Sequence, residues 1–137
     1  MQKIVLPLAA LAAVVIVAPA EASAAPRQRC DVVRPAPDYY EAGTVASELL
    51  TVPNNRRCTT ISVMGVRDTA NPADRCQTFL VQFLPSESET SYTDPVQACS
   101  YGGRRTVLAT DVPDGMPYRV LYRIDYLGQS VKFRVAH

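Results

Sequence analysis

The residues that could carry nucleophilic catalysis are few. The chain contains one histidine, His137, and four cysteines. A Ser-His-Asp or Cys-His arrangement needs a histidine beside the nucleophile, and we expect the cysteines to be joined in disulfides. The sequence also lacks a Gly-x-Ser-x-Gly nucleophile elbow and a glycine-rich phosphate loop. We therefore predict that the protein is not an enzyme of these classes and that it uses no cofactor.

Carboxylates are the remaining catalytic candidates, because two of them can act as general acid and general base. The candidate pairs are Glu41 with Glu48 and Glu87 with Glu89. The neighbouring Tyr39-Tyr40 pair could stack on a sugar. A loop that leads into a strand explains the same residues, so a carboxylate hydrolase is the less favoured hypothesis.

Metal-binding patterns are weak. Asp68, Asn71 and Asp74 offer oxygen ligands, but this segment lacks the glycine and the final glutamate of an EF-hand loop. No Cys-x-x-Cys spacing is present, and zinc sites usually contain such a pair. We predict no metal site.

A basic stripe lies in the segment Tyr118–Val135, where apolar residues alternate with charged ones. This alternation is typical of a half-buried hairpin. A two-residue turn at Gly128-Gln129 would place Ile124 opposite Phe133 and keep the apolar face whole. A longer loop would split that face, which burial of one face disfavours.

The same register predicts the other face of the hairpin. Arg123 would lie opposite Arg134, and Asp125 would lie opposite Lys132. The predicted basic surface consists of Arg119, Arg123, Lys132 and Arg134. Two interpretations stay open: a surface for an anion or an acidic partner, and a solvated sheet face.

A second candidate surface is the loop that contains Pro113, Asp114, Met116 and Pro117. A rigid, exposed loop can present the bait residue of a protease inhibitor at low entropic cost. The length and the cysteine count are similar to those of the subtilisin inhibitor family. The cysteines do not flank this loop, however, as the reactive-site bridge of that family requires.

The elements that must position these residues are predicted to be strands. Eleven prolines divide the chain into short segments rich in β-branched and aromatic residues. The expected strands are Cys30–Val33, Gly43–Val52, Cys58–Val66, Cys76–Leu84, Val96–Tyr101 and Arg105–Thr110, followed by the hairpin. We expect Val96–Tyr101 and Arg105–Thr110 to form a hairpin around Gly102-Gly103.

This pattern predicts an all-β fold, a single antiparallel β-sandwich with immunoglobulin-like architecture and about seven or eight short strands. The chain has no tryptophan, so the antibody-type family itself is not indicated. Four cysteines allow three pairings. We favour Cys30–Cys58 and Cys76–Cys99, because each pairing closes a short loop.

Residues 1–24 have the pattern of a secretory signal peptide. Lys3 precedes an apolar run, and small residues then lead to an expected cleavage after Ala24. Residues 25–137 would form one exported domain, periplasmic or extracellular, with no stable membrane span. The whole chain has a net charge of +1, which does not indicate a nucleic-acid partner.

Two short motifs resemble those of small exported proteins described as spore-associated. They are Gly-Thr-Val ahead of Cys58 and Tyr-x-Asp-Pro-Val ahead of Cys99. The resemblance covers a minor part of the chain, and Cys76 departs from it. It implies nothing about a site.

The sequence therefore predicts a small, exported, non-enzymatic β-sandwich that binds a protein or an envelope component. Two alternatives are a secreted protease inhibitor that uses the Pro113–Pro117 loop and a carboxylate-based hydrolase.

Overall fold

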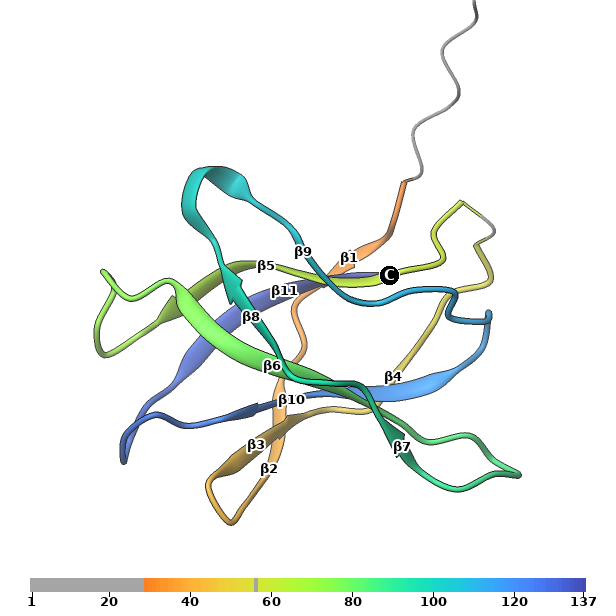
Figure 1. Cartoon of the computed structure of the whole chain (residues 1–137), viewed down its shortest axis with the longest axis horizontal. Coiled ribbons are helices and arrows are strands. Elements are labelled where there is room, and N and C mark those ends of the chain that lie inside the picture. Colours follow the sequence, from red (N-terminus) through yellow and green to blue (C-terminus); the bar gives the residue numbers. More distant parts are fainter. Residues whose placement is uncertain (1–28, 56) are drawn as a thin grey trace, which may run out of the picture.

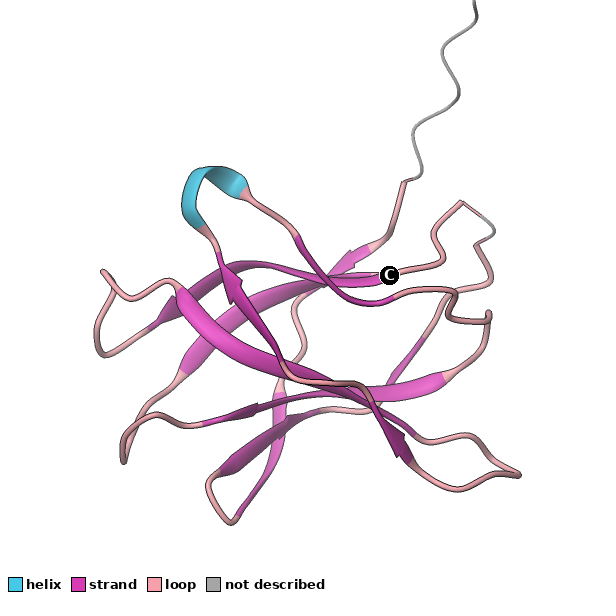
Figure 2. Cartoon of the chain, viewed as in Figure 1, coloured by secondary structure: helices cyan, strands magenta, loops and turns pink. Residues whose placement is uncertain are grey.

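The structure is a computed structural model that describes residues 29–55 and 57–137. Within this part the regular structure is almost entirely strand, apart from the 3-10 turn η1 (Tyr101–Gly103) (Figure 2). No helix in these ranges has the length and hydrophobicity needed to cross a membrane. The predicted signal segment 1–24 and its cleavage point lie outside the described residues.

The strands form two antiparallel sheets that face each other (Figure 1). The four-stranded sheet contains, in spatial order, β1 (Val32–Val33), β11 (Val131–Ala136), β5 (Ile61–Asp68) and β9 (Thr106–Ala109). The seven-stranded sheet contains β2 (Pro37–Glu41), β3 (Thr44–Ser47), β10 (Pro117–Arg123), β6 (Cys76–Phe83) and β7 (Ser91–Tyr92), with β4 (Leu50–Thr51) beside β10 and β8 (Val96–Cys99) beside β6. The predicted all-β sandwich is confirmed, although the strands are more numerous than expected.

The core lies between the inner faces of the two sheets. Phe79, Val81 and Tyr118 contribute fully buried side chains from the seven-stranded sheet, and Val63 and Val135 do so from the other sheet. Burying a side chain of this size stabilises the fold by about 1.5–3 kcal/mol relative to leaving it exposed. Alternation along each strand directs these residues inward, as the sequence pattern requires.

Both predicted disulfides are confirmed. Cys30 is joined to Cys58 and Cys76 to Cys99, and the described residues contain no free cysteine. Cys76 and Cys99 are directly opposite each other on β6 and β8. The first bridge ties the segment before β1 to the buried Cys58 ahead of β5.

The predicted hairpin between Tyr118 and Val135 is wrong. β10 pairs with β3, β4 and β6, whereas β11 pairs with β1 and β5, so the two strands belong to different sheets. The connection between them closes its own turn through a hydrogen bond from the Gln129 backbone N–H to the Tyr126 carbonyl, with Gly128 at φ +84°. Alternating apolar residues face a common core in either arrangement, so the pattern cannot distinguish neighbouring strands from strands that face each other.

The predicted hairpin around Gly102-Gly103 is wrong for the same reason. β8 pairs with β6 in the seven-stranded sheet, and β9 pairs with β5 in the four-stranded sheet. The two glycines have positive φ and allow η1 to carry the chain from one sheet to the other. A diglycine indicates a sharp turn, but the turn does not decide which strands pair.

The segment Gly43–Val52, predicted as one strand, is divided into β3 and β4, and both parts pair with β10. The interruption follows Ser47, whose hydroxyl accepts the Val120 backbone N–H. The strand β2 and the short β7 were not predicted. β2 forms a hairpin with β3 through Ala42 and Gly43, which both have positive φ, as a type I′ turn requires.

We expect the Cys30–Cys58 bridge to account for a large share of the stability. Replacing both residues by serine should lower the free energy of unfolding by roughly 3 kcal/mol, because the unfolded chain regains the entropy of a closed loop. Urea denaturation of this variant and of the intact protein measures the difference. A loss below about 0.5 kcal/mol, the usual range of surface substitutions, would contradict the expectation.

A second prediction concerns His137, which is buried and whose Nδ1 lies 2.6 Å from the Tyr118 hydroxyl. Burial lowers the pKa of His137 below its ordinary value. The unfolded chain therefore takes up a proton first as the pH falls below about 6.5. The free energy of unfolding should thus decrease between about pH 7 and pH 5.

His137 is the only histidine of the chain, so a His137→Gln variant should lose most of this pH dependence. Urea denaturation across the pH range provides the measurement. Equal pH dependence of both proteins would refute the assignment to His137.

Candidate functional site

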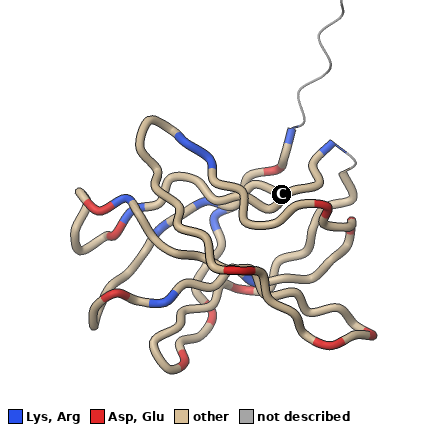
Figure 3. Tube along the Cα trace, viewed as in Figure 1, with Lys and Arg blue, Asp and Glu red and all other residues tan. Residues whose placement is uncertain are grey.

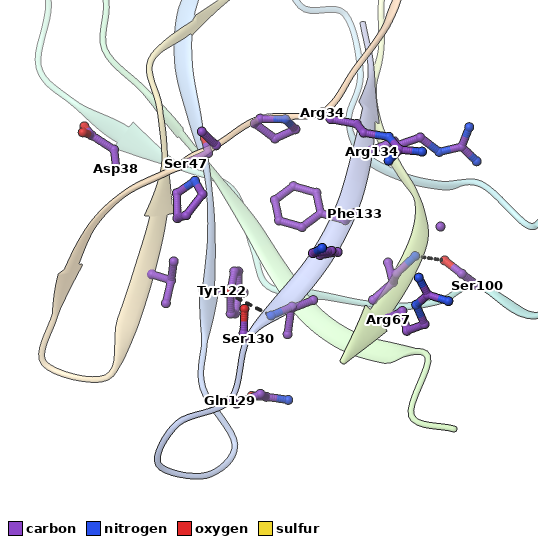
Figure 4. A pocket seen from close by; sticks show the side chains of 18 of the residues that line it. Arg34, Asp38, Ser47, Arg67, Ser100, Tyr122, Gln129, Ser130, Phe133 and Arg134 are labelled. Atoms are coloured by element: carbon purple, nitrogen blue, oxygen red, sulfur yellow. Dashed lines mark hydrogen bonds between the residues drawn. The ribbon is translucent and has the colours of Figure 1, made fainter. Parts of the chain in front are cut away.

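A cleft of about 1080 Å³ opens on one side of the sandwich. Its floor continues the inner face of the seven-stranded sheet, where Tyr40, Val45 and Tyr122 form one row across β2, β3 and β10. Phe133 of β11 projects toward this row (Figure 4). β2 is exposed along its whole length. The cleft thus lies where the inner face of β2 and β3 is not covered by the opposite sheet.

Two long continuous stretches of chain form walls of the cleft, and residues 65–67 of β5 add a shorter one. One long stretch is the segment Arg34–Tyr40, which leads from β1 into β2, and the other is Gln129–Arg134 at the start of β11. On the side away from β5, β11 pairs with β1 at Val135 and Ala136, and no other described strand lies beside it. The edge of β11 therefore borders the cleft.

Positive charge is concentrated in the lining of this cleft. Five of the lining residues are cations, namely Arg34, Arg67, Arg75, Lys132 and Arg134, and all five are exposed. The lining contains one carboxylate, Asp38. In the Cα trace, Lys and Arg positions are spread over the molecule, and acidic positions lie mainly in loops (Figure 3).

The sheet register places these cations side by side. Lys132 is directly opposite Arg67 on β5. Val33 is opposite Val135, so the next positions along, Arg34 and Arg134, are also neighbours; both side chains lie at the same end of the pocket in Figure 4. Like charges that face each other across a sheet are destabilising. None of the five forms an ion pair with another described residue. The salt bridge found among the described residues joins Arg119 to Asp38.

A β-bulge fixes the position of Arg134. The register between β5 and β11 shifts between Lys132 and Arg134, so that Gly65 and Val66 together oppose Phe133. Gly65 has φ +62°, and a Cβ built there would lie 3.3 Å from Arg134 Nε. The guanidinium therefore rests against a backbone that has no side chain at this point, as bulges near binding sites often allow.

The aromatic floor carries one hydroxyl group. Tyr122 is buried, and its hydroxyl accepts the Val131 backbone N–H at 3.4 Å. Burial raises the pKa of Tyr122 above its ordinary value, so the phenol stays protonated and neutral. Tyr122 can therefore donate a hydrogen bond, while Phe133 packs against its ring edge-to-face with centroids 6.2 Å apart.

The far end of the cleft is braced by a buried carboxylate. Asp68 accepts hydrogen bonds from the Tyr126 hydroxyl and from the Ala70 backbone N–H. The bond with Tyr126 lowers the pKa of Asp68 and raises the pKa of Tyr126 to about 12. Gln129, which lines the cleft, accepts the Asp125 backbone N–H at 2.7 Å. These contacts hold the connection that leads into β11.

The predicted basic stripe is divided between two surfaces. Lys132 and Arg134 line the cleft, whereas Arg119 and Arg123 do not. Arg119 donates to Asp38 at 2.5 Å and to the Ser47 carbonyl at 2.7 Å. Arg123 is opposite Thr44, so the predicted Arg123–Arg134 pair is wrong.

Three cations of the cleft were not predicted from the sequence. Arg34 follows β1, Arg67 lies on β5 and Arg75 precedes β6. These segments are far apart along the chain, and no local motif relates them. The sheet order and register bring them together, and neither can be derived from spacing alone.

Met116, the candidate bait residue, does not project from the proline loop. Met116 is half-buried and packs against the core. Backbone hydrogen bonds fasten the loop on both sides of Val52, because Gly115 donates to the Val52 carbonyl and Val52 donates to the Met116 carbonyl. Pro113 and Asp114 are exposed.

The first pair of candidate carboxylates, Glu41 and Glu48, is separated along the sheet. Glu41 is opposite Thr44, while Glu48 lies four residues further along that strand line, roughly 13 Å away at ~3.3 Å per residue. Acid–base pairs in glycoside hydrolysis need about 5–9.5 Å. Glu48 instead accepts the Ala36 backbone N–H. Glu87 and Glu89 are exposed in the loop after β6.

The two carboxylates considered for calcium accept hydrogen bonds from other groups of the chain. Asp68 binds the groups described above, and the Asp74 carboxylate accepts the Cys76 backbone N–H. Across the residues that the structure describes, no three His, Cys, Asp or Glu side chains are grouped as a metal site would need.

We expect Gly65 to be needed for the placement of Arg134. Gly65→Ala should destabilise the fold by about 1–2 kcal/mol, because alanine disfavours the left-handed backbone conformation found at this position. Displacement of Arg134 by the added Cβ should destabilise it further. Gly102→Ala is the matched control, because Gly102 has φ +65° and no atom within 4 Å of a built Cβ.

Urea denaturation measures the loss of unfolding free energy in both glycine variants. When Arg134→Ala is added to each variant, the two losses should become equal. Equal losses in the two glycine variants would show that Arg134 moves aside at no cost.

Comparison of the chain with models of protein families, with curated proteins and with solved structures finds no match.

Proposed function

We propose that this protein is an exported, non-enzymatic binding protein whose cleft takes a negatively charged partner, either a protein or an envelope component. The observation that carries the proposal is the group of five cations in the lining of the cleft, none of them in an ion pair within the described ranges. Clefts lined by one sign of charge concentrate the field and attract ligands of opposite charge.

The energetics favour a partner that contacts several cations at once. Single exposed ion pairs contribute about 0–1 kcal/mol, which is too little for useful affinity. A ligand that meets Arg34, Lys132 and Arg134 together gains more, and it also relieves the repulsion between neighbouring like charges. Tyr40, Val45 and Phe133 add apolar surface to the same cleft.

Several features support a binding role over catalysis. The histidine is held against Tyr118 in the core, and each cysteine is in a disulfide. The lining carboxylate, Asp38, is paired with Arg119. The cleft therefore presents no described group that is poised as a base. Disulfides persist in oxidising compartments, which supports export.

Charge reversal tests this proposal. Fluorescein-labelled polyglutamate should bind the intact protein at low salt, and binding should weaken as salt is added. The Lys132→Glu/Arg134→Glu variant should bind at least about tenfold more weakly, a loss of about 1.4 kcal/mol. Fluorescence anisotropy provides the measurement.

Arg104→Glu/Arg105→Glu is the matched control, because it reverses the same number of charges at two exposed residues that do not line the cleft. It should retain most of the affinity. Absence of polyglutamate binding to the intact protein, or equal weakening by the control, would overturn the proposal.

A further inference from the structure

The four-stranded sheet has an incomplete edge at the cleft. β1 pairs with β11 only at Val135 and Ala136. The chain then leaves the sheet through Pro35 and Pro37, which have no N–H to continue a ladder. The remaining edge, Val131–Arg134, has no strand beside it in the part of the chain that the structure describes. This is the edge that borders the cleft.

The free backbone N–H of this edge belongs to Phe133, because Lys132 and Arg134 face β5 and the Tyr122 hydroxyl accepts the Val131 N–H. His137 donates to the Asp31 carbonyl at 2.9 Å and accepts the Asp31 N–H at 2.8 Å, so its backbone faces the β1 side. Backbone direction alternates along an antiparallel strand, and Val135 and Phe133 therefore face the same side. The N–H and C=O of Phe133 are thus directed toward the position that β1 leaves vacant. Such an edge is a template for another strand.

We propose that the edge Val131–Arg134 receives an extended acidic segment of a partner protein, which adds to the four-stranded sheet beside β11. The inference rests on the proposed function and names the class of partner. Main-chain hydrogen bonds supply affinity in this mode of recognition, and alternate side chains supply specificity. The free edge is roughly 13 Å long for its four residues at ~3.3 Å per residue.

The two faces of β11 define the sequence that such a segment needs. Inward-facing residues of the added strand would lie beside Val131 and Phe133, over the aromatic floor. Outward-facing residues would lie beside Lys132 and Arg134, with Arg34 at the end of the row. The structure therefore selects a segment in which acidic and apolar residues alternate. An anion without a backbone would leave the groups of Phe133 unused.

A peptide experiment separates strand addition from simple attraction of charge. The probe is a short fluorescein-labelled peptide of alternating glutamate and valine, titrated against the full chain by fluorescence anisotropy. Two further peptides carry N-methyl groups on either the glutamates or the valines, which blocks one hydrogen-bonding edge in each case. A peptide of equal composition with its glutamates in one block controls for charge.

We expect the alternating peptide to bind more tightly than the block peptide. One of the two N-methylated peptides should lose about tenfold or more in affinity, while the other retains it. Amide hydrogen exchange at Phe133 should slow when the alternating peptide is bound. The Lys132→Glu/Arg134→Glu variant should bind every peptide more weakly than the intact protein does.

Equal binding of all four peptides, with unchanged exchange at Phe133, would overturn strand addition. The proposed anion binding would stand in that case, provided that charge reversal still weakened the complexes. Failure of both the peptides and polyglutamate to bind would instead refute the proposed function itself.

Discussion

The contact that Phe133 makes across the core relates the position of the cleft to the packing of the two sheets. Its ring meets Phe79 edge-to-face with centroids 4.9 Å apart and also packs against Tyr122. Edge-to-face pairs add about 0.5–1.5 kcal/mol beyond the area that they bury. The contact places β11 over β6 and β10 and leaves β2 and β3 beyond the edge of the opposite sheet. The same side chain thus closes the core on one side and forms the wall of the cleft on the other.

An open strand edge is a hazard as well as an opportunity, because it can pair with another copy of the same edge. Lys132 and Arg134 lie within the unpaired stretch of β11, and charged edge residues of this kind discourage pairing between identical chains. Two positive edges repel each other, whereas an acidic strand is attracted. The positive charges therefore disfavour pairing with a second copy of the chain and favour binding of a partner of opposite charge.

Much of the fold could be predicted from the sequence, because it depends on local signals. The alternation from Tyr118 to Val135 identified which residues face the core, and the spacing of the cysteines indicated the pairs that are found. The assignment of strands to sheets could not be predicted. Ile124 and Phe133 satisfy the same pattern whether they are neighbours in one sheet or face each other across two.

The candidate site was even less accessible to prediction for the same physical reason. Lys132 and Arg134 share a strand with an obvious pattern, and sequence reasoning selected them. Arg34 and Arg67 become their neighbours only through the registers of β1 and β5 on β11. A cluster assembled from four separate segments has no spacing that a one-dimensional pattern can show.

The positive cluster also has a cost that the rest of the molecule must offset. Each like-charge neighbour pair, such as Lys132 with Arg67, costs a few tenths of a kcal/mol, and no described acid relieves it. Each disulfide stabilises the fold by roughly 3 kcal/mol, which exceeds the summed repulsion among the five cations of the cleft. Cys76–Cys99 fastens β6 to β8, and Arg75 immediately precedes that bridge. The covalent links therefore allow a small core to tolerate an unneutralised cleft, and a ligand that supplied the missing negative charge would relieve the repulsion that the fold itself leaves in place.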